Sequence, residues 1–194
     1  MTRKRPRNPP SADETAVRRA RWAYVIAAAG LLAGAAPAPL AAETFLTIAP
    51  VFQHRRCTNC HVAADVARQS ETGRVHVPAA RRGTDDRGTI GLRCVTCHQA
   101  ENHEATGTPG AADWRLAPKA MGWNGLTPGE ICRAIVDRAR NGGRSVVEIA
   151  EHLARDPLVE WAWSPGGMRT PPPMTRQDFL AGLRDLARAG GPCP

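Results

Sequence analysis

The sequence predicts a mainly α-helical protein with long loops, organised as a single compact domain behind an N-terminal leader. Three observations support this fold class. The chain has 194 residues, which is about one domain's worth. Three helix-start signatures follow one another beyond Gly125. No stretch alternates apolar and polar residues as a half-buried strand would.

The N-terminal region has the three-part order of a secretory signal peptide. An Arg-rich start runs to Arg21, an apolar stretch continues to about Ala36, and the small-residue run APAPLAAE follows. This order predicts a signal peptide over residues 1–42, cleavage near Ala42, and a mature periplasmic chain of residues 43–194. The alternative is an uncleaved leader that anchors the protein in a membrane.

The net charge of +8 belongs mainly to this leader. Its first 42 residues hold seven basic side chains and two acidic ones, which leaves about +3 for the mature chain. The mature chain has no basic run interleaved with aromatic residues, so nucleic acid is not an expected partner.

The front half of the mature chain predicts one short helix and two loops. From Glu43 to about Arg56, apolar residues recur at helical spacing up to the first cysteine. Residues 64–91 and 102–118 are polar and Gly-rich, which is typical of loops with little regular structure.

Three helices are predicted in the rest of the chain. Each begins with Ser or Thr followed three residues later by Glu or Asp, the pattern of an N-terminal cap. The first should end at Gly142, the second before Pro157 and the third at Gly190. The starting pairs are Thr127 and Glu130, Ser145 and Glu148, and Thr175 and Asp178.

Large side chains are scarce in the mature chain. Residues 43–194 contain three Phe, four Trp and no Tyr, and the front half has few aliphatic runs. A chain with so few large apolar side chains needs another apolar group to complete its core. We therefore expect a large apolar cofactor.

Two copies of the motif Cys-x-x-Cys-His indicate what this cofactor is. On a helix, positions i, i+3 and i+4 share a face, so both cysteines and the histidine of each motif would project together. This suits haem, because the thiols can form thioethers with its two vinyl groups while the imidazole binds the iron. The sequence predicts two covalently bound haem c groups, attached through Cys57, Cys60, Cys94 and Cys97, with His61 and His98 as iron ligands.

Zinc and redox dithiol sites fit these motifs less well. A zinc site built from four cysteines separates its two cysteine pairs by about 15–20 residues, whereas 33 residues lie between Cys60 and Cys94. Zinc also has no need of a histidine after each pair. A thioredoxin-like site requires a βαβ setting that this sequence lacks.

The two motifs are too close for two tandem cytochrome domains. Their first cysteines, Cys57 and Cys94, are 37 residues apart, whereas a single-haem domain takes roughly 100 residues. We therefore expect both haems in one core.

The motifs and their surroundings resemble those of bacterial dihaem c-type cytochromes. More narrowly, FQHRRCTNCH, GLRCVTCHQAEN, WRLAPKAMGWNG, EICRAIVDRARNGGRS and DPLVEWAWSPG resemble exported proteins labelled isoquinoline 1-oxidoreductase subunit, over nearly all of the mature chain. The resemblance implies an electron carrier with a redox partner protein, a molybdenum hydroxylase, and a respiratory acceptor. Nothing in the chain resembles the molybdopterin or iron–sulfur subunits of such enzymes. The alternative is a haem enzyme, a peroxidase or a sulfur-compound oxidase, with one iron position open to substrate.

The sixth iron ligands are expected among the remaining Met and His side chains. Met121 lies in the Pro-containing loop LAPKAMGW after the second motif, where c-type cytochromes commonly supply a thioether. His76, in RVHVP, is the preferred loop candidate for the first haem. His152, on a predicted helix, competes with them, and His54 is expected at a haem edge. Met168, Met174 and His103 complete the candidates.

Cys132 and Cys193 lie outside the motifs and form an even pair. In an oxidising compartment a disulfide between them is expected, tying the first of the three predicted helices to the last. The alternative is two separate buried thiols.

Overall fold

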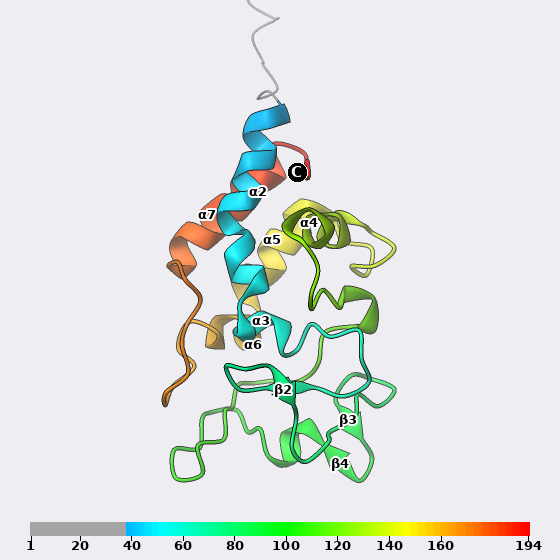
Figure 1. Ribbon diagram of the computed structural model, residues 1–194, viewed down its shortest axis with the longest axis vertical. Helices are drawn as coiled ribbons and strands as arrows, with labels where there is room; N and C mark the ends of the chain where they lie inside the picture. Colours follow the sequence, from blue (N-terminus) through cyan, green and yellow to red (C-terminus); the bar gives the residue numbers. More distant parts are fainter. Residues whose placement is uncertain (1–37) are drawn as a thin grey trace, which may run out of the picture. The chain divides into compact units, whose positions relative to one another are not determined.

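Four longer helices lie together at one end of the described residues, and short hairpins and loops lie at the other (Figure 1). The computed structural model describes residues 38–194, which belong to one compact unit. The predicted signal peptide lies almost wholly outside the described residues. The longer helices are α2 (Ala38–Gln53), α4 (Pro128–Val136), α5 (Val146–Arg155) and α7 (Arg176–Arg188). Among residues 38–194, no helix is both long enough and apolar enough to span a bilayer.

Shorter elements connect this helical part with the loops. The short helices are α3 (Arg55–Thr58), α6 (Pro157–Trp161) and the 3-10 turns η1 (Cys94–Thr96) and η2 (Lys119–Met121). Two antiparallel hairpins pair β1 (Arg68–Gln69) with β2 (Arg74–Val75) and β3 (Gly88–Thr89) with β4 (Leu92–Arg93). The described residues are thus partly helical with long loops, as expected, and they also contain four short strands that the sequence did not predict.

The apolar core lies between α2, α4, α5 and α7. Phe52 of α2 is its centre, with its ring 5.2 Å from that of Phe179 and 5.7 Å from that of Trp123, centroid to centroid. The Trp123 Nε1 donates a 2.9 Å hydrogen bond to the Phe52 carbonyl. Other side chains at most 2% exposed include Phe45, Ile48, Val51, Ile131, Ile135, Leu183 and Leu186.

The helix starts are confirmed, while one predicted end is wrong. Thr127 and Glu130 form the predicted capping box of α4, and Ser145 and Glu148 form that of α5. The helix α4 ends at Val136, well before Gly142. The following turn is held instead by Asn141, whose Nδ2 donates to the Ile135 carbonyl at 2.8 Å and to the Arg144 carbonyl at 2.9 Å.

The structure also corrects the first predicted helix. It begins at Ala38, within the predicted leader, and stops at Gln53. His54 then caps a separate short helix, α3, by accepting a hydrogen bond at its Nδ1 from the Arg56 backbone N–H.

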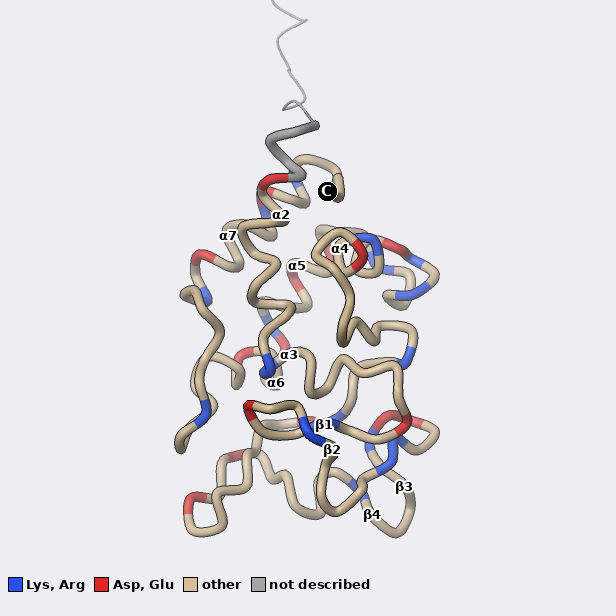
Figure 2. Tube along the Cα trace, viewed as in Figure 1, with Lys and Arg blue, Asp and Glu red and all other residues tan. Residues whose placement is uncertain are grey.

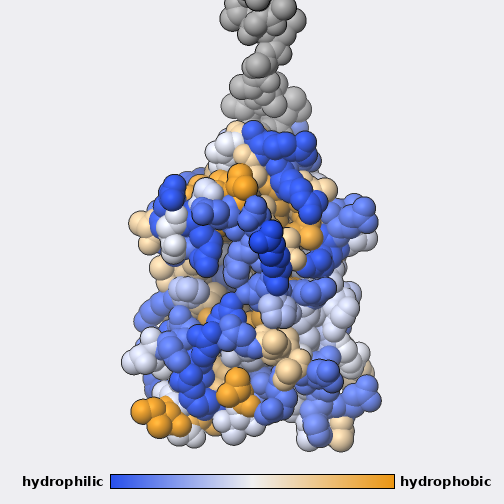
Figure 3. All heavy atoms as spheres, turned by 180° about the vertical axis from the view of Figure 1, so that it is seen from behind, coloured by the Kyte–Doolittle hydropathy of each residue, from blue (hydrophilic) through white to orange (hydrophobic). Residues whose placement is uncertain are grey.

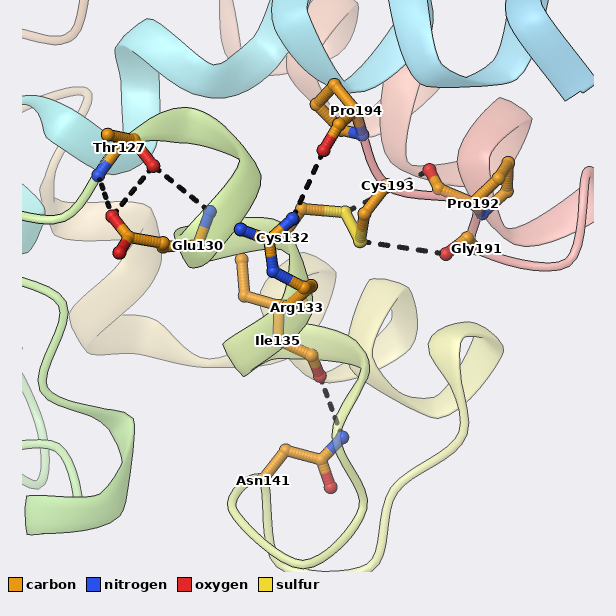
Figure 4. Close-up of a disulfide and its surroundings, with 10 residues drawn as sticks. All are labelled: Thr127, Glu130, Cys132, Arg133, Ile135, Asn141, Gly191, Pro192, Cys193 and Pro194. Atoms are coloured by element: carbon orange, nitrogen blue, oxygen red, sulfur yellow. Dashed lines mark hydrogen bonds between the residues drawn. A yellow bond between two sulfur atoms is a disulfide. The ribbon is translucent and has the colours of Figure 1, made fainter.

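The predicted disulfide between Cys132 and Cys193 is confirmed. It joins α4 to the segment that follows α7, with a Cα–Cα distance of 5.6 Å (Figure 4). Arg133 adds a hydrogen bond from Nη1 to the Pro194 carbonyl at 3.2 Å. The C-terminal segment is therefore fastened to the core at two neighbouring positions.

One buried arginine holds the loops together. Arg82 is 7% exposed, and its guanidinium donates to the carbonyls of Val62, at 2.7 Å, Ala64 and Ala117. An ion pair with Asp86 at 2.5 Å balances its charge. These contacts connect three loops that have few apolar side chains of their own.

Charged and polar side chains cover most of the surface. Figure 2 shows Lys and Arg in blue on the hairpins as well as on the helices. The face in Figure 3 is largely hydrophilic, with hydrophobic groups in its upper part and at its lower edge. The large apolar side chains that are exposed in the hairpin region are Val75, Val77, Ile90 and Val95.

Candidate functional site

Each Cys-x-x-Cys-His motif opens on its own pocket. The first pocket is lined by Cys57, Cys60 and His61. Its volume, including the solvent-open entrance, is about 1120 Å³. The second is lined by Cys94, Cys97 and His98, and its volume, including the entrance, is about 1230 Å³. The remaining lining of the first pocket combines core side chains such as Phe52, Ile135 and Phe179 with charged and polar ones.

Both motifs form the same hydrogen-bonded turn, although neither lies in a long helix. In the first motif, the backbone N–H groups of Cys60 and His61 donate to the Cys57 carbonyl at 3.1 and 2.9 Å. In the second, those of Cys97 and His98 donate to the Cys94 carbonyl at 3.2 and 2.9 Å. The helical geometry assumed for the motifs is present only as a short turn, because α3 ends at Thr58 and η1 at Thr96. A single turn is enough to bring two thiols and one imidazole to the same side.

His61 is fixed at both its nitrogen and its ring face. Its Nδ1 donates to the Met121 carbonyl at 2.8 Å, and its ring stacks on Trp123 with centroids 3.5 Å apart. Because a carbonyl can only accept, Nδ1 carries the proton and Nε2 keeps its lone pair. Burial lowers the pKa of His61 to about 4, against the opposing effect of the Met121 carbonyl. The imidazole is therefore neutral and ready to bind a metal through Nε2.

His98 repeats this arrangement in the second pocket. Its Nδ1 donates to the Pro109 carbonyl at 2.7 Å, and its ring stacks on Trp114 with centroids 4.4 Å apart and planes 2° apart. Burial lowers its pKa as well. The sequence predicted no role for either tryptophan and did not reveal these contacts, for which the local signal is a Trp in the loop after each motif.

His76 lies beside the second motif, not the first as expected. Its ring centroid is 5.8 Å from that of His98, and its Nδ1 donates to the Pro78 carbonyl at 2.7 Å. Two imidazoles on opposite sides of one metal, with bonds of about 2.0–2.1 Å, have ring centres about 6 Å apart. The spacing of His76 and His98 is close to this value.

Met121 is in the first pocket, but on the side of His61. Its carbonyl accepts the His61 hydrogen bond, which places the Met121 backbone on the side of His61. His152 of α5 also lines this pocket, and its Nε2 lies 3.7 Å from the Asp156 carboxylate. Burial lowers the pKa of His152, while Asp156 opposes that effect.

The other candidate ligands lie elsewhere. Met168 is 99% exposed. The Met174 carbonyl accepts a 2.9 Å hydrogen bond from Trp163, and His103 is exposed and contacts Thr106. His54 caps α3. None of these four side chains lines either pocket.

The four motif cysteines are free thiols. Burial raises the pKa of Cys57 to about 12 and that of Cys60 to about 11. Cys94 is half-buried and Cys97 is exposed. Within the described residues, no three His, Cys, Asp or Glu side chains are grouped as a metal-ion site.

The two pockets share a wall. Residues that line both are Arg56, Cys60, Arg115, Leu116 and Trp161. The Trp161 ring meets that of Trp114 edge to face, with centroids 4.9 Å apart. Groups bound in the two pockets would therefore be separated by a single layer of side chains.

Comparison with family models, with curated proteins and with solved structures finds no match to this chain.

Proposed function

We propose that this protein is an exported dihaem c-type cytochrome that transfers electrons between partner proteins. One observation carries the proposal. Each motif places two thiols and an imidazole on one turn beside its own pocket, with the imidazole Nδ1 bound to a loop carbonyl and its ring stacked on Trp. The same constellation built twice, from different loops, is hard to explain without two identical cofactors.

The residues of both pockets fit haem. The cysteines are available as thiols for thioether bonds, and the two motif histidines present Nε2 lone pairs because Nδ1 is occupied. Haem would supply an iron that alternates between ferric and ferrous states. The carbonyls of Met121 and Pro109 fix the orientation of His61 and His98 and increase their basicity.

His76 completes the second site. Its ring centroid lies 5.8 Å from that of His98, and its own Nδ1 is engaged, so its Nε2 is free to serve as the sixth ligand. For the first site, His152 replaces Met121 as our candidate, because it lines the pocket and Met121 lies on the side of His61. Two filled coordination spheres suit an electron carrier, which needs no open iron position.

Exposure differs between the two sites. Cys57 and Cys60 are both partly buried, whereas Cys97 is exposed. We infer that the second haem exchanges electrons with partners and that the first receives or stores them across the shared wall. The donor, on resemblance alone, is a molybdenum hydroxylase of the periplasm. The disulfide suits that oxidising compartment.

A haem enzyme is the second candidate. The observation that favours it is the contact between His152 and the Asp156 carboxylate. This contact keeps His152, our candidate for the sixth ligand of the first site, in an ion pair. If that contact persists, one iron is open to a peroxide or a sulfur compound. Carbon monoxide separates the two functions, because it binds rapidly only to an open ferrous position.

Haem attachment is tested by producing the full chain in cells with a cytochrome c maturation system and measuring covalent haem as the pyridine haemochrome. We expect two haems per chain in the wild type and one in Cys94→Ser/Cys97→Ser. The double variant Cys132→Ser/Cys193→Ser is the matched control, since it also removes two cysteines but should keep two haems. A wild-type protein that carries zinc and no covalent haem would overturn the proposal.

A further inference from the structure

The wall between the pockets contains a buried cation with an unused donor. Arg56 lines both pockets, and its side chain is 4% exposed. Its Nη2 pairs with Glu71, but its Nε is buried without a hydrogen-bond partner among the described residues. A buried donor left unpaired destabilises the folded protein. An acceptor inside the pockets would remove this destabilisation.

Other arginines lack this combination. Arg115 also lines both pockets, but its Nη1 and Nη2 are taken by Asp113 and Asp156. Arg82 and Arg176 each have a buried Nε without a partner, yet neither lines a pocket. Within the described part of the chain, only Arg56 both lines the two pockets and has a buried donor without a hydrogen-bond partner.

The position of Arg56 is fixed by the fold. Its backbone N–H donates to His54 Nδ1 at 3.3 Å in the cap of α3, and it directly precedes Cys57. Its guanidinium carbon lies 6.0 Å from the centre of the Trp161 ring, within cation–π distance. The guanidinium is therefore held at the shared wall by the turn that forms the first motif.

A carboxylate is the acceptor that this site fits. Arginine binds carboxylates through charge-assisted hydrogen bonds, which are roughly twice as strong as neutral ones. Haem carries two propionate carboxylates, and the rest of its surface is largely apolar. We propose that Arg56 binds a haem propionate at the wall between the two sites and places a positive charge close to both irons.

This inference rests on the proposed function and predicts an electrostatic effect on the reduction potentials. A fixed positive charge in a poorly solvated wall favours the reduced iron, which carries one positive charge fewer. Arg56 should thus raise the potential of at least one haem. Glu71, its partner, should have the opposite effect.

The test is a spectroelectrochemical titration of the holoprotein after its covalent haems have been counted. We expect Arg56→Gln to lower at least one potential, Arg56→Lys to keep most of the wild-type value, and Glu71→Gln to raise it. Arg176→Gln is the matched control, because it removes another arginine with an unpaired buried Nε, and should leave both potentials unchanged.

Two results would overturn the assignment. One is an Arg56→Gln protein with two haems and unchanged potentials. The other is a fall of potential in both Arg56→Gln and Glu71→Gln, which would indicate general loosening of the wall. If Arg56→Gln fails to mature, Glu71→Gln decides alone, since an unchanged or lowered potential contradicts the proposal. Absence of covalent haem from the wild type would instead overturn the proposed function, and the haem count reveals it first.

Discussion

The imidazoles of His76 and His98 lie with their centroids 5.8 Å apart and their planes inclined by 64°. Each ring is held by an Nδ1 hydrogen bond to a proline carbonyl, that of Pro78 or of Pro109. Both Nε2 atoms therefore keep their lone pairs, as two ligands of one metal must. This pair is the most specific geometric support for bis-histidine ligation in the second pocket.

Removing His76 should leave one coordination position of one haem iron vacant. His76→Ala should convert one of two low-spin ferric signals in the EPR spectrum to high spin and allow carbon monoxide to bind half of the ferrous haem. His103→Ala is the control, because that histidine is exposed and lines neither pocket. Two unchanged low-spin signals in His76→Ala would remove this residue from the ligand set.

Replacing His76 by methionine, another iron ligand, should shift the reduction potential of one haem. Methionine raises the potential of a haem relative to a second histidine. His76→Met should therefore raise one of the two midpoints in a redox titration and leave the other close to its wild-type value. A shift of both midpoints by the same amount would contradict ligation of a single iron by His76.

Met121 and His152 should respond differently to substitution. Met121→Leu keeps the backbone carbonyl that holds His61, so the visible spectrum should not change. His152→Ala should allow carbon monoxide to bind one ferrous haem. The account of the first site is wrong if Met121→Leu loses a sulfur-to-iron charge-transfer band or if His152→Ala behaves as the wild type.

The disulfide should contribute strongly to stability. Cys132 and Cys193 are 61 residues apart, and closing a loop of this length is worth about 4 kcal/mol in the chain-entropy treatment. Denaturant unfolding of Cys132→Ala/Cys193→Ala should show a loss of this order. Thiol labelling of the denatured, unreduced wild-type holoprotein should find no free cysteine, and two labelled residues would show an open pair.

Arg82 should contribute strongly to the stability of the loops that it joins. Arg82→Ala removes hydrogen bonds to the carbonyls of Val62, Ala64 and Ala117 and leaves Asp86 without its partner. We expect a loss of about 3 kcal/mol or more in the free energy of unfolding. The neighbouring exposed Arg81 is the control, because Arg81→Ala should change this free energy by less than about 0.5 kcal/mol. Equal effects of the two substitutions would argue against the role of Arg82.

The sequence predicted the features that depend on interactions between residues close together in the chain. The caps at Thr127, Ser145 and Thr175 follow from hydrogen bonds over three residues, and all three are present. The end of α4 could not be predicted, because Asn141 folds back on the Ile135 carbonyl. The sequence shows two glycines nearby but not this competing contact.

Long-range placement could not be read from the sequence. The pairing of His76 with His98 depends on how the loop of residues 64–91 folds back, and Arg82 determines that through three distant carbonyls. The stacking of His61 on Trp123 joins residues that are far apart in the chain. Motif residues were identifiable by spacing, but their partners required the tertiary structure.

Intact mass measurement of the purified, denatured wild-type protein, followed by peptide mapping, tests the dihaem assignment most directly. We predict a mass increase of two haem groups, one on the peptide with Cys57 and Cys60 and one on the peptide with Cys94 and Cys97. A polypeptide mass without covalent haem, obtained from cells that mature a known c-type cytochrome in parallel, would contradict it.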